Sequence, residues 1–338
     1  MRVEKIRIAV DAMGGDFAPQ NVIAGTLDAL REVNNRFEVL FVGSESVIKK
    51  QLDAVNHQGL AYHVVDAPDV IGMHDQSTAV LREKKNSSIG IGMTMHKEGH
   101  ADAFVSAGHS GAMMSASTLI LGRIEGVSRP TIGAFLPSER GVCLLLDAGA
   151  NVDCKPQHLY EFAIMGSIYA NHMFNIPNPS VGLLNIGEES SKGNEVVKEA
   201  HKLLTQSKLN FVGNVEGRDI LQGKAHVVVC DGFVGNIILK FGESVPSFFK
   251  NRLKQHTNNS LVRKLMGLMM RNTLRNALKS MDYEEYGGVP VLGVNGISII
   301  GHGKSSPKAI KNMVLKAEEA VKKKINNRIQ EALTAGIS

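Results

Sequence analysis

Glycines, small polar residues and charged side chains directly follow short apolar runs at several places in this chain. The first such turn runs from Asp11 to Asp16 (DAMGGD). It follows the apolar run Ile6–Val10 and precedes Pro19, a favoured first residue of a helix. Paired glycines let backbone N–H groups approach an anion closely, and a following helix adds a favourable dipole. The dinucleotide fingerprint G-x-G-x-x-G is absent from this turn. We therefore predict phosphate or substrate contacts at Asp11, Gly14, Gly15 and Asp16, the alternative being a tight turn without a ligand.

A second turn, Ser106–Ala112, also follows an apolar run and opens a predicted helix. Its small residues permit close approach of a ligand, and we predict substrate contacts at Gly108, His109 and Ser110. The stretch resembles the nucleophile motif G-x-S-x-G but fails it, because Gly111 directly follows Ser110. His109 can donate a hydrogen bond to a substrate, although most loop histidines are simply polar surface.

The stretch Asn185–Glu195 places Lys192 after a glycine turn and before a predicted helix. A lysine at such a point can hold a phosphate as a point charge. The alternative is a solvated lysine without a ligand.

The stretch Cys230–Asn236 repeats the order of strand, turn and helix. Asn236 lies in the first helical turn, where its amide can face a ligand, and we predict substrate contacts at Asp231 and Gly232. The alternative is that Asp231 only caps the helix and that Asn236 has no role.

Other common motifs are excluded. Gly303–Ser305 matches only the end of a P-loop, since G-x-x-x-x-G-K-[ST] requires glycine where Ser298 stands. Cys143 and Cys230 lie in strand-like runs, where a core thiol is the usual role, and neither C-x-x-C nor H-E-x-x-H occurs. We therefore predict no metal site, no disulfide framework and no cofactor.

The composition is ordinary for a soluble globular protein and does not indicate nucleic-acid binding. The 338 residues carry a net charge of +5 and 21% charged side chains, which suits an acidic partner, a membrane surface or an anionic substrate. No RNA- or DNA-binding motif occurs. The N-terminus does not resemble a signal peptide, and no run approaches the roughly 20 apolar residues of a membrane span. We expect a cytoplasmic protein.

The elements that position these turns alternate between strand and helix. This alternation predicts an α/β fold with a largely parallel sheet covered on both faces, in a single domain over residues 1–338. A capping serine, Pro307 and apolar residues from Ile310 to Ile329 at helical spacing predict one last helix. Strands are predicted at 6–10, 37–42, 62–66, 102–106, 131–136, 142–147, 180–186, 210–214 and 226–230, and the other helices at 19–33, 45–54, 77–97, 109–122, 156–173, 193–206 and 232–254.

Residues 244–281 differ from the rest of the chain. They contain no Asp or Glu and eight basic residues, and Leu261, Leu265, Leu268 and Met269 form an apolar stripe at helical spacing. An apolar helix with a basic polar face suits an anionic membrane, and it equally suits a dimer contact. We predict a protruding helical pair over 244–282, joined near 255–260, that contacts a second copy and, around 261–270, the membrane.

Taken in order from about residue 6 to about residue 330, the motifs resemble one family closely. That family is the bacterial phosphate acyltransferase of phospholipid synthesis (PlsX). The family more often shows Asn-Thr where this chain has His109-Ser110, and Lys304 interrupts what is often His-Gly-Ser-Ser. The matching stretches are Ala9–Asp16, Ser106–Ala112, Leu146–Asn151, Leu184–Glu195, Asn214–Asp219, Asp231–Asn236 and Leu292–Gly296.

The resemblance implies a three-layer α/β/α sandwich with a mostly parallel mixed sheet, similar to isopropylmalate dehydrogenase and phosphate acetyltransferase. It implies a homodimer that associates peripherally with the membrane. The implied reaction transfers a long-chain acyl group from acyl carrier protein to inorganic phosphate. The product would pass to a membrane acyl-phosphate:glycerol-3-phosphate acyltransferase that makes lysophosphatidic acid. Lys192 and Asn236 match positions important for activity, so we predict that both are catalytic.

This chemistry agrees with the residues present. Phosphate itself attacks the thioester carbonyl, so the site must hold phosphate and stabilise an oxyanion without a Cys or Ser nucleophile. Two other functions fit less well. Another enzyme of the same fold, such as a short-chain phosphotransacetylase or a decarboxylating dehydrogenase, is one; the dehydrogenase would need a nicotinamide site. A non-catalytic membrane scaffold is the other, but it has no use for several anion-shaped turns.

Overall fold

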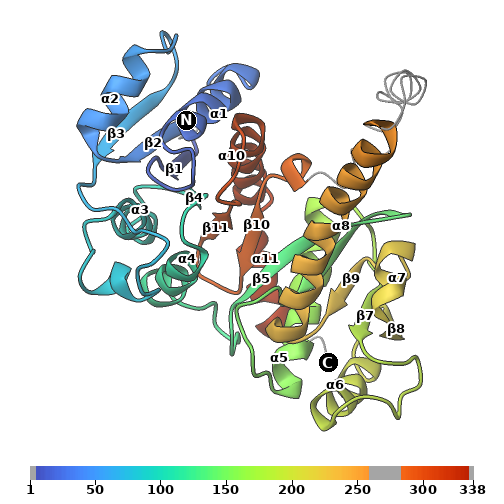
Figure 1. The fold of residues 1–338 in the computed structure, drawn as a ribbon. Coiled ribbons are helices and arrows are strands. Elements are labelled where there is room, and N and C mark those ends of the chain that lie inside the picture. The colour runs from blue at the N-terminus through green and yellow to red at the C-terminus, as the bar shows by residue number, and fades with distance from the viewer. Residues whose placement is uncertain (1–4, 259–282, 335–338) are drawn as a thin grey trace.

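The computed structural model describes residues 5–258 and 283–334 (Figure 1). Within these residues eleven strands form one sheet, in the order β3-β2-β1-β4-β11-β10-β5-β6-β9-β7-β8. The strands are β1 (Arg7–Asp11), β2 (Glu38–Gly43), β3 (Tyr62–Asp66), β4 (Ala103–Ser106), β5 (Thr131–Ser138), β6 (Gly141–Leu146), β7 (Val181–Leu184), β8 (Phe211–Val215), β9 (Val227–Val229), β10 (Val289–Leu292) and β11 (Ile297–Ile300).

The helices lie between these strands along the chain. The α-helices are α1 (Gln20–Glu32), α2 (Glu45–Asp53), α3 (Ser88–Lys97), α4 (Ser110–Ala116), α5 (Pro156–Met173), α6 (Glu195–Thr205), α7 (Gly217–Gln222), α8 (Gly232–Asn258), α10 (Pro307–Lys322) and α11 (Ile325–Thr334). Shorter turns of helix are η1 (Ala79–Leu81), η2 (Ser117–Leu121) and η4 (Tyr283–Glu285).

The sheet is mixed but mostly parallel. Antiparallel pairing joins only β10 with β11, β10 with β5, and β5 with β6, among the described strands. Following the ladders, β1, β2, β3, β4 and β11 run in one direction, and β6, β7, β8 and β9 run in the other. The sheet therefore has two parallel halves of opposite direction, joined through β10 and β5.

Helices cover both faces of each half, which gives three layers. In the N-terminal half, α1 and α10 pack on the face that carries Ile8 and Val10, and α3 and α4 pack on the face that carries Ala9. In the other half, α5, α6 and α11 pack on the face with Leu144 and Leu146, and α7 and α8 pack on the opposite face. This arrangement confirms the predicted α/β/α sandwich. The prediction was possible because strands buried on both faces carry apolar residues at successive positions.

The structure corrects several predicted elements. The predicted helix 77–97 contains only the short turn η1 and α3, because Ser87 caps α3 by accepting a hydrogen bond from the Gly90 N–H. The predicted last helix divides into α10 and α11 at Lys324, whose φ of 51° is left-handed. The prediction omitted α7, β10 and β11. Helix α8 runs past the predicted end at 254 to Asn258, and residues 259–282, with the rest of the predicted helical pair, lie outside the described residues.

Candidate functional site

The buried Asp11 side chain links two of the predicted ligand turns, Asp11–Asp16 and Ser106–Ala112, by hydrogen bonds. Its carboxylate is 2% exposed and accepts hydrogen bonds from the Ser106 hydroxyl at 2.6 Å and from the Met13 N–H at 3.0 Å. Ser106 Oγ in turn accepts from the Gly108 N–H at 3.0 Å. Burial raises the pKa of Asp11, and the hydrogen bond from Ser106 opposes this rise. Asp11 therefore orients the two turns, and its buried carboxylate is not presented to solvent.

The glycines of these turns allow the chain segments to touch. A side chain on Gly14 would overlap the Asp11 carboxylate and lie 2.8 Å from the Gly108 nitrogen. Gly15 has a φ of +108°, and a side chain there would lie 3.2 Å from the carbonyl oxygen of Gly303. The Asp16 N–H donates to that same Gly303 oxygen at 2.7 Å. We call the resulting cluster the first turn group, comprising residues 11–16, 106–110 and 301–305.

His109 and Ser110 lie at the start of α4 in the first turn group. The Nδ1 atom of His109 accepts a hydrogen bond from the Ala112 N–H at 3.1 Å, so His109 caps this helix. Ser110 is the first helical residue and is exposed. The capping bond explains a polar residue at 109 without a substrate contact.

A second turn group forms after β6 and β9, from residues 147–151 and 231–236. Asp147 is fully buried and accepts hydrogen bonds from the N–H groups of Gly149, Ala150 and Asn151 and from the Asn151 amide, at 2.7–3.1 Å. Burial raises the pKa of Asp147, and the hydrogen bonds from the turn oppose this rise. The Asn151 carbonyl oxygen accepts from the Gly232 N–H at 2.7 Å, which links the two turns.

Asn236 emerges from this second turn group. Asp231 caps α8 by accepting a hydrogen bond from the Val234 N–H at 2.8 Å, and Asn236 follows one turn later with an exposed side chain. Gly149 has a φ of +129°, and a side chain there would lie 3.4 Å from Asn236 Oδ1. The absence of a side chain at 149 leaves the Asn236 amide uncovered. Asp147 and Asn151 are supporting residues that the prediction did not include, although Asp147 directly follows an apolar run, which was the available signal.

Lys192 lies on the loop between β7 and α6, residues 185–194, which we call the lysine loop. The lysine is exposed, and its aliphatic stem runs beside Gly187, where a side chain would lie 3.2 Å from Lys192 Cγ. The ammonium group has no ion-pair or hydrogen-bond partner among the described residues. Asn194 ends the loop and caps α6 by accepting from the Val197 N–H at 2.9 Å. A free cation at a helix N-terminus can bind an anion.

The structure therefore brings the predicted residues together in two places. Asp11, Gly14, Gly15 and Asp16 meet Gly108, His109 and Ser110 in the first turn group. Asp231, Gly232 and Asn236 share the second turn group, and the lysine loop follows β7, the parallel neighbour of β9. No hydrogen bond or ion pair between described residues joins the first turn group to the other two. The strands that precede the first turn group run opposite to those that precede the second turn group and the lysine loop, whereas Lys192 and Asn236 follow strands of the same direction.

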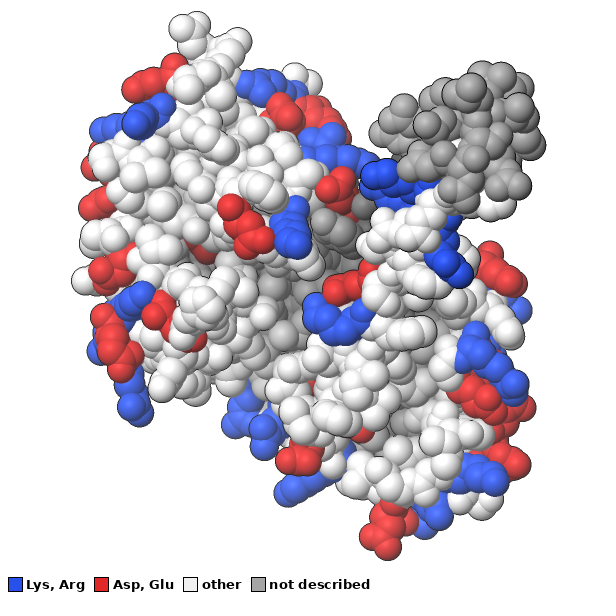
Figure 2. Space-filling view, in the orientation of Figure 1, with Lys and Arg blue, Asp and Glu red and all other residues white. Residues whose placement is uncertain are grey.

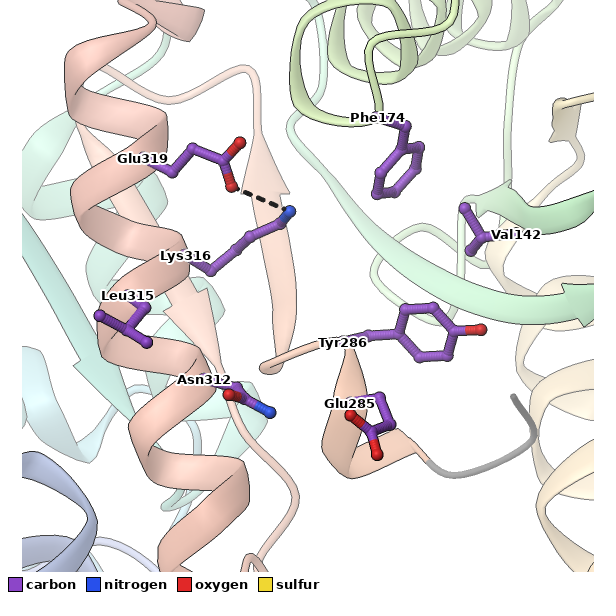
Figure 3. Close-up of a pocket in the computed structure, with 8 residues that line it drawn as sticks. All are labelled: Val142, Phe174, Glu285, Tyr286, Asn312, Leu315, Lys316 and Glu319. Carbon is purple, nitrogen blue, oxygen red and sulfur yellow. Dashed lines mark hydrogen bonds and ion pairs between the residues drawn. The ribbon is translucent and has the colours of Figure 1, made fainter. Parts of the chain in front are cut away.

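A cavity of about 260 Å³ lies elsewhere, between α10 and the β5–β6 hairpin (Figure 3). One side of the cavity is lined by Phe174, Tyr286 and Val142. The other side is lined by α10 residues that include Lys316 and Glu319, whose Nζ and Oε2 atoms are 3.2 Å apart. None of the predicted site residues lines this cavity. This cavity is therefore separate from the predicted site residues.

The predictions about metal binding and the membrane can be compared only with the residues that the structure describes. Over residues 5–258 and 283–334, no three or more His, Cys, Asp or Glu side chains are grouped so as to hold a metal ion. Over the same residues, no helix combines the length and apolar character needed to cross a membrane. The predicted membrane residues Leu261, Leu265, Leu268 and Met269 lie outside the described residues.

The fold is similar to that of two solved phosphotransacetylases. The EutD phosphotransacetylase from Staphylococcus aureus superimposes with a TM-score of 0.58 at 17% sequence identity, over 94% of each chain. A phosphotransacetylase from Streptococcus pyogenes superimposes with a TM-score of 0.59, also at 17% identity over 94% of each chain. At this identity the likeness defines a phosphotransacetylase-like fold.

The sequence is similar to a narrower group. Residues 6–328 match the family model described as "Fatty acid synthesis protein". The chain is 49% identical to the phosphate acyltransferase of Thermodesulfovibrio yellowstonii, over 97% of this chain and 94% of the relative. It is 47% identical to the phosphate acyltransferase of Chlorobaculum parvum, over 97% of this chain and 99% of the relative. The chain belongs to the phosphate acyltransferase (PlsX) family, which confirms the resemblance given by its motifs.

Proposed function

We propose that this protein transfers a long-chain acyl group from acyl carrier protein to inorganic phosphate, giving the acyl phosphate used for phospholipid synthesis. The observation that carries the proposal is Lys192, an exposed cation without a partner among the described residues, on a braced loop at the start of α6. Its neighbour across the parallel strands is the turn that exposes Asn236. Membership of the family supports an acyl-transfer reaction, and Lys192 and Asn236 provide side chains that can hold phosphate.

In the proposed mechanism, phosphate is the nucleophile. A phosphate oxygen attacks the thioester carbonyl carbon, the C–S bond breaks, and the thiolate of the carrier leaves while the acyl phosphate forms. Lys192 holds the phosphate by charge, and the Asn236 amide donates a hydrogen bond to the carbonyl oxygen as negative charge develops there. The leaving thiolate is a weak base, so the step needs no strong general acid.

The cysteines fit direct transfer rather than an acylated enzyme. Cys154 lies near the second turn group, where burial and then the charges of Asp147 and Asp231 raise the pKa of its thiol to about 12. Burial also raises the pKa of Cys143 to about 12. A thiol acts as a nucleophile only as its thiolate, and neither residue provides one at neutral pH.

We propose a homodimer in which α8 packs on a second copy. Phe233, Ile237, Phe241 and Phe248 occupy one face of α8, and all four are exposed, with Phe241 71% exposed. An apolar face of this extent on a soluble chain calls for a partner. Phe241→Glu is expected to convert the dimer to monomer in sedimentation, and an unchanged dimer would remove this face from the interface.

We also propose that the dimer works at the cytoplasmic face of the membrane. Lys250, Arg252 and Lys254 are exposed near the C-terminal end of α8, and Figure 2 shows basic side chains gathered there. Each basic residue near an anionic surface adds about 1 kcal/mol of attraction. The same charge suits the acidic acyl carrier protein. Release of acyl phosphate at the membrane would pass it to an acyl-phosphate:glycerol-3-phosphate acyltransferase.

The substrate is tested by comparing donors at saturating phosphate. Long-chain acyl-carrier-protein thioester should give phosphate-dependent thiol release, and acetyl-coenzyme A should give little. The opposite preference would identify a short-chain phosphotransacetylase, the class with which this chain shares its fold.

A further inference from the structure

We propose that Asn214 and Lys224 are positioning residues for Lys192. They hold the Glu188–Glu189 segment of the lysine loop from outside, and so fix where Lys192 meets phosphate. The inference rests on the proposed function, because it assigns these two residues a role through Lys192. It also gives a role to the stretch Asn214–Asp219, whose side chains have no part in the mechanism above.

Asn214 and Lys192 share one acceptor. The carbonyl oxygen of Glu189 accepts a hydrogen bond from the Asn214 amide at 2.9 Å and another from the Lys192 backbone N–H at 3.1 Å. Asn214 lies on β8, pairs with Leu183 of β7, and is only 2% exposed. Its position is thus set by the sheet, and a movement of its amide is passed to the Lys192 backbone through a single oxygen atom.

The other half of the Asn214 amide is left unpaired. Its Oδ1 atom is buried and has no hydrogen-bond partner among the described residues. A buried acceptor without a partner is costly, so an apolar or smaller side chain would serve packing better than asparagine does. The contact that accounts for an amide at this position is the one it donates to Glu189.

Lys224 provides the second anchor. Its ammonium lies 2.7 Å from Glu188 Oε1 and 3.4 Å from Asp219 Oδ2, and the hydrogen bond to Glu188 is the largest cause of its raised pKa. Glu188 is 60% exposed, and exposed ion pairs contribute little to stability, so global folding does not explain the contact.

Contacts within the lysine loop also hold its backbone in place. The Asn185 amide donates to the Lys192 carbonyl oxygen at 3.1 Å. Gly193 has a φ of +87°, and a side chain there would lie 2.6 Å from Asn185 Oδ1. All these bonds use the loop backbone or its glutamates, and none uses the Lys192 ammonium. The Lys192 backbone is therefore held in place, and its ammonium is left available for an anion.

The test measures KM for phosphate and kcat in the full-length enzyme. Lys224→Met should raise KM for phosphate about tenfold, which is below the 10²-fold that a displacement of 1 Å can cost. Lys224→Arg should restore most of the loss. Lys202→Met is the matched control, because Lys202 forms an ion pair of similar length with Glu199 on α6 outside the loop. Equal effects of the Lys202 and Lys224 changes would overturn the proposal in favour of a general charge effect.

Glu188→Gln separates positioning from direct binding. If Lys224 acts by anchoring the loop, Glu188→Gln should raise KM for phosphate as Lys224→Met does, and the double variant should be no worse than either. If Lys224 binds phosphate itself, removing the competing carboxylate should leave KM unchanged or lower it. That result would overturn the proposal.

Asn214→Asp tests the anchor formed by Asn214, since a carboxylate cannot donate to the Glu189 carbonyl oxygen. It should raise KM for phosphate at least as much as Lys224→Met; if the variant fails to fold, the Lys224 and Glu188 series decides alone. Lys192→Ala is measured beside them. If Lys192→Ala loses activity while the anchor variants keep KM within twofold of wild type, the inference fails and the proposed function stands. If Lys192→Ala keeps activity, the proposed function fails at this site.

Discussion

Replacement of Lys192 by alanine is expected to separate catalysis from stability. The side chain is exposed, and its ammonium makes no ion pair or hydrogen bond with the described residues. Surface changes without such contacts usually alter the free energy of unfolding by less than about 0.5 kcal/mol. The bonds that brace the loop use the Lys192 backbone, which alanine keeps. Lys192→Ala should therefore melt at the wild-type temperature.

The expected loss lies in the reaction. Removal of one preorganised group that stabilises charge in the transition state, here the cation that holds the attacking phosphate, costs about 10²–10³ in turnover, or about 2.7–4 kcal/mol. Lys192→Ala should lose activity in this range when thiol release is followed at saturating acyl donor and varied phosphate. Lys192→Arg should retain more activity than alanine, because it keeps the charge and the stem that lies beside Gly187.

Lys208→Ala is the matched control, since Lys208 is also exposed and lies beyond α6, outside the lysine loop. Lys208→Ala should leave kcat and the KM for phosphate unchanged. Wild-type phosphate-dependent turnover in Lys192→Ala would refute the reasoning, as would a loss matched by an equal fall in melting temperature.

The remaining predictions concern the second catalytic residue, stability and the membrane. Asn236→Ala should impair transfer and leave binding of acyl carrier protein intact; a loss explained wholly by unfolding would show that it only supports the turn. Burial raises the pKa of Glu318, but hydrogen bonds from Arg36 and then Lys322 outweigh it, so the pKa falls below 4.5. Glu318→Gln should therefore lower the free energy of unfolding by about 1.5–3 kcal/mol at neutral pH. That difference should disappear as the pH falls below 4.5, and calorimetry across pH that shows a constant difference would contradict the assignment. Leu265→Glu with Leu268→Glu should abolish flotation with anionic liposomes, whereas equal flotation of wild type and variant would place this stripe elsewhere.

The sequence predicted the layers of the fold well because local patterns determine them. The central residues of β1 and β4, Ile8–Val10 and Ala103–Val105, are apolar at successive positions, which is typical of strands buried on both faces. Strands β10 and β11 were missed because each has four residues, lies among glycines and is stabilised by pairing with distant strands. The break at Lys324 was hidden because the apolar stripe continues through Ile325 and Ile329, which are both buried.

The sequence indicates which residues are candidates for the site but not how they are arranged in space. Turns rich in glycine after apolar runs indicated the positions, but strand direction depends on long-range pairing that periodicity does not contain. Strands β6 to β9 run opposite to β1, because β5 and β6 form an antiparallel pair. Asp11, at the end of β1, and Asn236, after β9, therefore follow strands of opposite direction. Sequence also could not distinguish an acid that faces a ligand from one that is buried, and Asp11 is of the second kind. The support of Lys192 by Asn214 joins β8 to the loop that follows β7, 25 residues earlier in the chain, and depends on strand pairing that only the structure shows.

Transfer of acyl groups to phosphate is tested most directly by tracing the phosphate. The enzyme is incubated with long-chain acyl carrier protein and radiolabelled inorganic phosphate, and acyl phosphate and free thiol are both quantified. Direct attack by phosphate predicts labelled acyl phosphate in equal amount to the thiol released, with no acyl group retained on the protein. Thiol release without labelled acyl phosphate, or at the same rate without phosphate, would contradict it.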